Sequence, residues 1–474
     1  MPRIGTGLGL GLFQGGSGGI DAQAQAHYNR VIADGGVVPA GLSGVNAFFT
    51  AVKTIYGTSD ITTAVSVGLD AQYLGYKLGA GAGTTLGQAA QKLYSCAGSS
   101  GDVVQTTAAS QPLLLAHSRT NYYWGPNVTG NFIQSNALYS NSNFDTEFNV
   151  NLVYSGAVNR VVGCRSIGDG MNVAIGAAGL TFEYKVGATV YVATAAVFNV
   201  DNTEYTFRVT RDSATGLFTV LRDGNSLTVT GDQIAGALNN SSNALEINGV
   251  LGGIQGCLGK INWVKMYVSG SVVQYFNPNQ YNASTSQTQW TSTTGEVWTI
   301  NTGTAATGYK GVLVDRTRVM SDGIDDSMTS SYSTSNANIT VYMADTLFVV
   351  EAVKSSGGIN SLNGNFAQRN STQRRMWIDD GNNAVDPATT ANISTLNLAI
   401  GSITATNSLA RINNGADATV TQVFTPVNRT INIFGSYTFG QTCFNTFLLS
   451  SNINNGTTKT EMYNYIRSIN NNAF

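Results

Sequence analysis

The segment TEYTFRVTRDSATGLFTVLRDGNSLTVTG, residues 203–231, gives the clearest indication of the fold. Tyr205, Phe207 and Val209 alternate with polar neighbours, which is the spacing of a strand with one buried face. A turn sequence, SATG, comes next, and RDGN (residues 222–225) forms a second turn. Between the turns the alternation resumes at Leu217, Thr219 and Leu221. The pattern predicts a meander of antiparallel strands.

Residues 257–278, CLGKINWVKMYVSGSVVQYFNP, extend this pattern with two more predicted strands. In the first of them, strict alternation divides the side chains between two faces: Ile261, Trp263 and Lys265 on one, and Asn262, Val264 and Met266 on the other. Pro278 and the polar run NQYNASTSQTQ that follows it favour a domain boundary.

The second half of the chain repeats this order of elements. SLARINNGADATVTQ (residues 408–422) corresponds to LFTVLRDGNSLTVTG (residues 217–231). TINIFGS followed by FNTFLLSSN corresponds to LEINGVLGG followed by INWVKMYVSG. The match lies in the order of the elements more than in identical residues, and we interpret it as a degenerate duplication of one β-sandwich.

Helical signals lie near both ends. Asp21 and Ser43 are predicted to cap two helices in residues 21–60, the second with an apolar stripe. The stripe consists of Val45, Phe48, Phe49, Val52 and Ile55. The predicted organisation is a Gly-rich arm (1–20), a small helical unit (21–60), a first jelly-roll sandwich (61–280), and a second (281–474) that ends in a helix, TKTEMYNYIRSINN.

Composition narrows the class of protein. Charged residues make up 11% of the 474 residues, against about 25% in ordinary globular proteins. The net charge of −2 provides no basic field, so we expect no nucleic-acid partner. The four cysteines, Cys96, Cys164, Cys257 and Cys443, are scattered without metal-ligand spacing. We expect buried free thiols, although a Cys164–Cys257 disulfide stays open.

The N-terminal stretch MPRIGTGLGLGLFQGGSGGID resembles an export signal only at first sight. A signal peptide needs a continuous apolar segment of about 7–15 residues, and a membrane span needs roughly 20. Here glycine alternates with the apolar residues and lowers helix propensity. We therefore expect a retained, flexible arm that anchors the chain to a larger assembly through Arg3, Leu8, Leu10, Leu12 and Phe13.

Catalytic signals are few. Retaining glycoside hydrolysis needs two carboxyl groups about 5 Å apart, and we find no strand of closely alternating acidic residues, so that Glu147 and the other glutamates are interpreted as isolated. Asp379 and Asp380 would point to opposite faces of a strand. His27 and His117, the only histidines, have no nucleophile motif near them, and His27 is expected on a helix surface. We expect no enzymatic activity.

Asp322, Asp325 and Asp326 in SDGIDDSM form the densest group of carboxylates. Clustered oxygens suit calcium. The competing interpretation, which the sequence favours, is a glycine-centred turn in which aspartate accepts backbone hydrogen bonds. Apart from this calcium loop, no cofactor is predicted.

Two aromatic segments are candidates for contact with a sugar. RTNYYWGPN supplies Tyr122, Tyr123 and Trp124, and QRRMWIDDGNN supplies Arg375, Trp377 and Asp379. Aromatic residues in strands more often belong to a core or a subunit interface. Both interpretations remain open at this point.

The order DGIDD, FVVEAV, RINNGA, INIFGS, FLLSS and TEMYNYI resembles laminin-G and concanavalin-A-like jelly rolls, in the versions found in bacteriophage structural proteins. The resemblance covers most of residues 21–474. It implies tandem antiparallel sandwiches and a place on a phage particle, as a capsid decoration, head fibre or tail fibre.

The function expected from this resemblance is that of a non-enzymatic virion surface protein. It would be made in the host cytoplasm without a signal peptide and without membrane insertion. Its expected partners are other capsid or tail proteins, further copies of itself in a homo-oligomer such as a trimer, and a host-surface glycan. The alternatives are a secreted bacterial lectin or adhesin and, less favoured, a tailspike that cleaves polysaccharide.

Overall fold

A computed structural model describes residues 19–471, with internal gaps. The gaps are 80–87, 118–119, 140–141, 154–158, 165–169, 177–178, 197–200, 240–243, 250–255, 283–287, 304–307, 323–325, 335–337, 348–356, 361–364, 370–374, 380–383, 386–395, 404–406, 422–428, 434–441, 452–453 and 455. Between residues 357 and 396 the description is limited to the backbone of the strands. The predicted anchor residues Arg3, Leu8, Leu10, Leu12 and Phe13 lie outside the described residues. None of the helices in the described ranges is long and apolar enough to cross a membrane.

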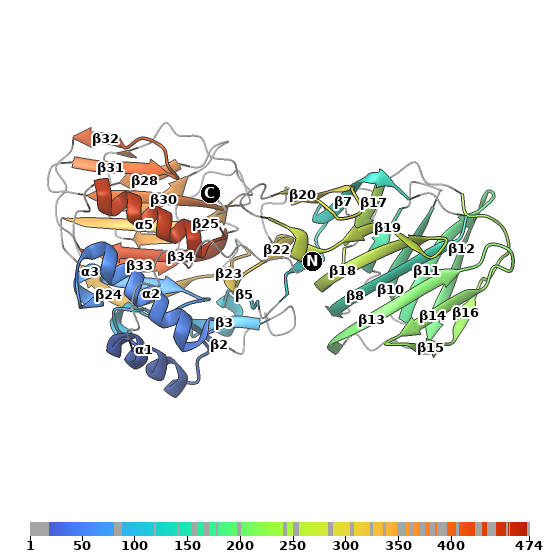
Figure 1. Ribbon diagram of the computed structural model, residues 1–474, viewed down its shortest axis with the longest axis horizontal. Helices are drawn as coiled ribbons and strands as arrows, with labels where there is room; N and C mark the ends of the chain where they lie inside the picture. Colours follow the sequence, from blue (N-terminus) through green and yellow to red (C-terminus); the bar gives the residue numbers. More distant parts are fainter. Residues whose placement is uncertain are drawn as a thin grey trace.

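The chain folds into two lobes, and the right-hand lobe of Figure 1 is a sandwich of two antiparallel sheets, here called the middle sandwich. Its front sheet has the order β15 (Asn225–Leu227), β14 (Phe218–Arg222), β13 (Asp201–Arg211), β8 (Phe144–Val153), β18 (Leu258–Val268), β6 (Tyr122–Gly125) and β22 (Val312–Val314), with β19 (Ser271–Phe276) also on β18. Its back sheet has the order β16 (Val229–Gly231), β12 (Thr189–Ala196), β11 (Gly179–Val186), β10 (Met171–Gly176), β9 (Asn159–Gly163), β17 (Ala244–Ile247), β7 (Phe132–Leu138), β21 (Val297–Asn301) and β20 (Gln289–Thr291).

Inward-facing aromatic residues of the two sheets form the core of the middle sandwich. Phe182 of the back sheet stacks on Phe218 of the front sheet with ring centroids 5.1 Å apart. The predicted meander of β13, β14 and β15 is confirmed. The buried stripe of β14 was wrong by one residue, because Phe218 and Val220 point inward while Leu217 is 56% exposed.

The other lobe, here called the split domain, is a second sandwich whose two sheets share strand β3. Its continuous strand order is β26 (Gly357–Asn360), β33 (Arg429–Ile433), β24 (Met328–Thr334), β4 (Val103–Val104), β3 (Gln88–Leu93), β5 (Leu113–Leu115), β23 (Arg318–Met320), β34 (Thr442–Ser450), β25 (Ile339–Leu347), β30 (Leu396–Ile403), β31 (Asn407–Ile412) and β32 (Ala418–Thr421), with β1 (Val67–Asp70) on β34 and β2 (Tyr76–Leu78) on β3. A separate small sheet contains β27 (Asn365–Arg369), β28 (Arg375–Asp379) and β29 (Ala384–Val385).

Helices cover one sheet of the split domain (Figure 1). They are α1 (Ala22–Ala33), α2 (Gly41–Tyr56), α3 (Ile61–Ala64) and α5 (Gly456–Ile469). Along β25, Val341 and Met343 point into the sandwich core, while Tyr342 and Ala344 point toward the helices. Both faces of this sheet are therefore buried, so the helices are a layer of the split domain and not a separate unit.

Helix boundaries follow the capping signals in part. Asp21 caps α1 as predicted, because its Oδ1 accepts the backbone N–H groups of Gln23 and Ala24 at 2.9 and 3.0 Å. Helix α2 begins at Gly41, before the predicted cap Ser43, and ends at Tyr56, where the capping residue Gly57 takes a φ of 63°.

Strand pairing corrects the predicted domain boundaries at 60/61 and 280/281. Strand β1 pairs with β34 and β5 pairs with β23, so residues 67–115 belong with the C-terminal half of the chain. Strands β20 and β21 lie beyond the polar run that was taken as a boundary, and β21 pairs with β7 of the middle sandwich. The middle sandwich is thus inserted into the split domain. The sequence signals mark turns and polar connections, but they do not say which strands pair.

The two chain crossings between the lobes run side by side. Strand β5 pairs with β23 on the split domain, and β6 pairs with β22 on the middle sandwich. An apolar cluster covers this junction, formed by Leu113, Leu115, Tyr122, Trp124, Leu258, Val312, Val314, Met320 and Cys443. The junction is therefore packed like a core.

A buried ion pair fastens the split domain where the chain returns from the insertion. Arg316 donates from Nη2 to both carboxylate oxygens of Asp70, at 2.7 and 2.6 Å. It also donates from Nη1 to the carbonyl oxygen of Ile469, at 2.7 Å, and the Thr446 hydroxyl donates to Asp70 at 2.7 Å. This network joins the end of β1, the bend between β22 and β23, β34 and the end of α5.

Candidate functional site

The outward face of the front sheet carries polar and charged side chains, and strand β8 supplies a row of them by strict alternation. In β8, Phe144, Phe148 and Val150 point into the core. The alternate positions, Asp145 and Glu147, are partly exposed, followed by Asn149 and Asn151. The strand FDTEFNVNLV therefore places two carboxylates and two amides in a row on one face.

A bulge in β18 adds an amide and an indole to this face. The register against β8 shifts between Ile261 and Trp263, and a bulge lets two consecutive residues share one face. Ile261 and Val264 are buried, while Asn262 and Trp263 between them are partly exposed. The prediction that Trp263 and Lys265 share a face is confirmed, but Ile261 was placed with them wrongly and Asn262 was placed opposite them wrongly.

Ion pairs and rings connect the charged groups. Arg208 donates to Asp145 at 3.0 Å and its guanidinium lies 4.3 Å from the ring centroid of Tyr267. The Tyr267 hydroxyl donates to Glu147 at 2.7 Å. Glu147 lies 3.7 Å from the Lys265 ammonium.

Lys265 lies over two aromatic rings of the same face. Its Nζ is 4.5 Å from the ring centroid of Trp263 and 5.4 Å from that of Tyr275. Beside them, Asn262 donates to Asn149, which in turn donates to Thr206 at 2.9 Å. We call this surface the polar–aromatic face; it consists of Asp145, Glu147, Asn149, Arg208, Asn262, Trp263, Lys265, Tyr267 and Tyr275.

Four groups on this face, Asp145, Arg208, Tyr267 and Tyr275, have raised pKa values. Partial burial raises the pKa of Asp145, and the ion pair with Arg208 opposes that rise. Burial, together with the neighbouring Glu147, raises the pKa of Tyr267 to about 12. Tyr267 is therefore a hydrogen-bond donor at neutral pH.

The polar–aromatic face combines flat apolar rings, amides and charged groups on a rigid sheet. Rings can stack on the apolar face of a pyranose, and the polar groups can exchange hydrogen bonds with its hydroxyls. Arg208 contacts Asp145, and Tyr267 and Lys265 contact Glu147, so the position of each carboxylate is fixed by its neighbours. The arrangement suits binding of a hydroxyl-rich ligand.

The first predicted aromatic candidates are not at this surface. Tyr122, Tyr123 and Trp124 are all buried. Tyr122 and Trp124 belong to the interlobe cluster and Tyr123 to the core of the middle sandwich. None of the three rings is open to stack on a sugar, so their assignment as glycan contacts was wrong. Their alternation between two buried surfaces explains why β6 is aromatic on both faces.

In the described part of the carboxylate loop, a carboxylate accepts a backbone N–H of the same loop, as the turn interpretation expects. Asp326 is buried, and its Oδ2 accepts the backbone N–H of Asp322 at 2.8 Å and the Tyr309 hydroxyl at 3.4 Å. Asp325 lies outside the described residues. Among the residues that the structure describes, no group of three or more His, Cys, Asp or Glu side chains is placed to hold a metal. The calcium loop stays a prediction without structural support.

The second aromatic candidates lie on β28, and their side chains are not described. Arg375, Trp377 and Asp379 occupy alternate positions of this strand and therefore share one face. The prediction of glycan contact there stays open.

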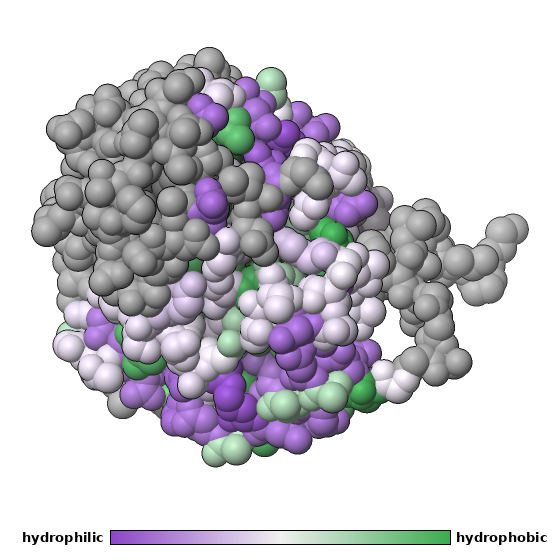
Figure 2. Space-filling model, turned by 90° about the vertical axis from the view of Figure 1, so that its left-hand side faces the viewer, coloured by the Kyte–Doolittle hydropathy of each residue, from purple (hydrophilic) through white to green (hydrophobic). Residues whose placement is uncertain are grey.

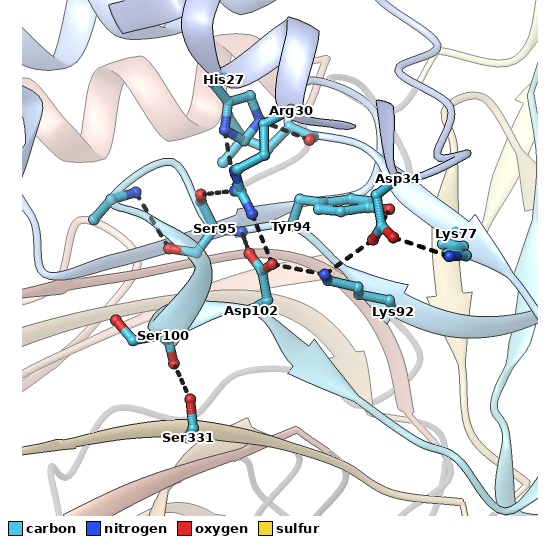
Figure 3. Close-up of polar contacts among 12 residues, drawn as sticks. His27, Arg30, Asp34, Lys77, Lys92, Tyr94, Ser95, Ser100, Asp102 and Ser331 are labelled. Atoms are coloured by element: carbon cyan, nitrogen blue, oxygen red, sulfur yellow. Dashed lines mark hydrogen bonds and ion pairs between the residues drawn. The ribbon is translucent and has the colours of Figure 1, made fainter. Parts of the chain in front are cut away.

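A second charged cluster lies between α1 and strands β2 and β3 (Figure 3). Asp102 accepts from Arg30 at 2.7 Å and lies 3.0 Å from Lys92. Lys92 also donates to Asp34, at 3.0 Å. Lys77 and Tyr94 donate to the same Asp34 carboxylate, at 3.0 and 2.8 Å, and these donors hold its pKa well below the usual range. The cluster is satisfied internally and fastens α1 to the sheet.

His27 also lies at this joint, and its predicted surface position was wrong. Its ring is buried, with Nε2 at 2.9 Å from the carbonyl oxygen of Leu74. Burial lowers its pKa to about 4.

Buried free thiols are confirmed for Cys96, Cys164, Cys257 and Cys443.

The described surface at the helix-bearing end has a different character. Figure 2 shows hydrophilic residues over much of the described surface there, with small, separate hydrophobic spots. The exposed apolar residues of this lobe include Ile20, Ile32, Val37 and Leu78. Single exposed apolar residues of this kind are normal on protein surfaces and need no special explanation.

Comparison with known proteins identifies no sequence relative. No family model matches the chain, and no curated protein matches it. Among solved structures, it is similar to domains LG4-5 of the mouse laminin alpha1 chain, with 10% identity, 72% of this chain and 93% of that chain covered, and a TM-score of 0.27. A putative carbohydrate binding protein from Bacteroides ovatus shows 20% identity over 44% of this chain and 65% of that chain, with a TM-score of 0.28.

A sialidase from Trypanosoma rangeli shows 8% identity over 64% of this chain and 63% of that chain, with a TM-score of 0.27. At these identities and TM-scores the similarities carry no argument about function. The mainly β, jelly-roll architecture follows from the sheets described above.

Proposed function

We propose that this chain is a non-enzymatic glycan-binding protein of the adhesin type, and that the polar–aromatic face of the middle sandwich is its binding surface. The observation that carries the proposal is the placement of Trp263, Tyr275, Lys265 and the Asn262 amide, all partly exposed, on one face of the front sheet. A rigid sheet presents these groups with little loss of conformational entropy on binding.

A hydrolytic function is the second candidate, because Asp145 and Glu147 share a strand face. Retaining hydrolysis needs one carboxyl group that donates a proton and one that attacks the sugar. Here Asp145 is paired with Arg208, and Glu147 is held by Tyr267 and Lys265. These contacts hold both carboxylates in positioning interactions, so we propose binding without cleavage.

The place of display is proposed from the sequence resemblance alone. We propose a bacteriophage particle surface, with the Gly-rich arm as the attachment to other virion proteins and a homo-oligomer such as a trimer as the assembled form. A secreted bacterial adhesin would use the same polar–aromatic face. Mass spectrometry of purified particles and of the secreted fraction distinguishes these locations by where the chain is found and where it begins.

Glycan-array binding of the full chain tests the proposed function. We expect binding that is lost in Trp263→Ala and retained in the control Thr181→Ala, which alters the outward face of the back sheet. Equal binding by both variants would place the site elsewhere. Release of reducing ends from a bound polysaccharide, lost in Asp145→Asn or Glu147→Gln, would favour the hydrolytic candidate instead.

A further inference from the structure

We infer that the polar–aromatic face selects uncharged glycans over acidic ones, and that the Glu147–Lys265 pair sets this selection. The inference rests on the proposed function and deepens it by naming the chemical class of the ligand. Two observations carry the inference: positive and negative side chains on this face are equal in number, and the cations already lie beside carboxylates.

The outward positions of the central strands balance their charges. Register across β13, β8 and β18 aligns Glu204 with Asn151 and Lys260, and Arg208 with Glu147 and Lys265. With Asp145, the described outward side chains of these strands comprise three carboxylates and three cations. A surface that selects anions would show an excess of Arg and Lys.

Arg208 is not available to an acidic group. Its guanidinium donates to Asp145 at 3.0 Å and stacks on Tyr267 at 4.3 Å. An anion that recruited Arg208 would have to separate it from Asp145, leaving that carboxylate without its cation. The loss of one charge-assisted hydrogen bond would offset the gain of another.

Lys265 is the remaining cation beside the aromatic rings, and Glu147 lies next to it. The 3.7 Å separation from Glu147 is longer than a hydrogen bond. An anion at Lys265 would therefore meet attraction from the ammonium and repulsion from a carboxylate at similar range. A neutral hydroxyl meets no such repulsion, since it can accept from Lys265 and donate to Glu147 at once.

The same geometry makes Lys265 a specificity-determining residue. Its ammonium lies over Trp263 and Tyr275, on the rings that a sugar would use for stacking. A stacked pyranose would displace the ammonium toward Glu147 and shorten the ion pair to a hydrogen bond. Glu147 would thus pair with the displaced Lys265 ammonium, and the sugar would replace that ammonium on the rings of Trp263 and Tyr275.

The test is to titrate the full chain with neutral and acidic probes. Tryptophan fluorescence and calorimetry measure the binding. The probes are lactose with 3′-sialyllactose, and mannohexaose, cellohexaose and maltohexaose with hexagalacturonate, together with the tightest ligand from the array. We expect neutral probes to bind at least about tenfold more tightly than acidic ones, and a dissociation constant that changes less than about twofold between 50 and 500 mM salt.

Two variants separate the selection from the binding itself. Glu147→Gln leaves a net positive face, and we expect it to gain affinity for the acidic probes by about fivefold or more, with a new salt dependence. Lys265→Met keeps the length of the side chain but removes the charge, so we expect acidic probes to bind still more weakly while neutral ones persist. Trp263→Ala should weaken binding of every probe by about tenfold or more.

The failures are distinguishable. Preferential, salt-sensitive binding of acidic probes by the unaltered chain would overturn the neutral selection and leave the proposed glycan-binding function standing. Equal affinity of Glu147→Gln and the unaltered chain for acidic probes would remove Glu147 from the selection. Absence of binding to every array glycan and every probe would overturn the proposed function and this inference together.

Discussion

The helix-covered sheet of the split domain and the front sheet of the middle sandwich differ in what lies on their second face. In the split domain, Tyr342 and Leu448 face a helical layer, and the sheet is buried on both sides. In the middle sandwich, the corresponding face carries Glu147, Lys265 and Trp263, which remain partly exposed. The comparison indicates that one kind of sheet can serve as a structural core or as a binding surface, depending on its cover.

The ion pairs of the two lobes differ in burial in the same way as the two sheets. The Asp70–Arg316 pair of the split domain is almost fully buried, with side chains 0% and 5% exposed. The Asp145–Arg208 pair of the polar–aromatic face keeps 21% and 34% of its side-chain surface exposed. The first pair joins distant chain segments, whereas the second is accessible to a ligand.

The largest expected effect comes from breaking the buried pair. Asp70→Ala leaves the Arg316 guanidinium buried without its carboxylate, so we expect a loss of about 3–5 kcal/mol in the free energy of unfolding. Denaturant titration measures it. The control Asp145→Ala removes the exposed counterpart and should cost less than about 1 kcal/mol. Equal losses in the two variants would contradict the division between covered and open charges.

Acidification should lower the free energy of unfolding through His27, which is buried where α1 packs on the sheet. Unfolded His27 takes up a proton below about pH 6.5, while the folded side chain stays neutral until its pKa of about 4. The folded pKa is lowered, so the unfolded state binds more protons in this window. The stability due to neutral His27 is present above pH 6.5 and is lost as the pH falls toward 4, by at most about 3 kcal/mol.

Urea unfolding at pH 7 and pH 4.5 measures this loss, and His27→Gln should flatten it. A pH dependence that is identical in His27→Gln and the unaltered chain would assign the acid sensitivity to other groups. Such a result would also weaken the view that the α1 joint is sealed from solvent.

A smaller effect is expected from removing the indole of the open face. Trp263→Ala should weaken glycan binding by about tenfold or more, equivalent to about 1.4 kcal/mol. Its melting temperature should change little, because Trp263 is partly exposed and lies outside the core cluster. Calorimetric titration and thermal unfolding of the same preparation separate the two quantities; lost stability alongside lost binding would mark Trp263 as a structural residue.

The smallest effect is expected at the rim of the α1 cluster. Lys77 and Asp34 form an ion pair whose side chains are 35% and 39% exposed. Lys77→Met should change the free energy of unfolding by less than about 0.5 kcal/mol, because exposed pairs contribute little. A loss above 1 kcal/mol by denaturant titration would show that the cluster acts as one network.

Local pattern predicted the strands better than their partners. Alternation in residues 203–231 correctly predicted β13, β14 and β15. The insertion of one sandwich into another escaped prediction because β1 and β34 are joined by hydrogen bonds between segments almost 380 residues apart. Turn and boundary signals act over a few residues, so they carry no information about such pairing.

The candidate site was visible in part. Alternation in FDTEFNVN places Asp145, Glu147 and Asn149 on one face, so the sequence contains a signal for this row, and the interpretation of Glu147 as isolated is wrong. The position of Asn262 was beyond prediction, because it depends on a bulge that the sequence of β18 does not announce. His27 was misplaced because its burial depends on contact with Leu74, which lies in the turn after β1, 47 residues along the chain.

Hydroxyl-radical footprinting of the full chain, with and without its tightest array glycan, tests the central claim most directly. The account predicts that oxidation of Trp263 and Tyr275 falls on binding, while oxidation of peptides from the helix-covered split domain is unchanged. Protection confined to the split domain, with Trp263 and Tyr275 oxidised equally in both samples, would contradict it.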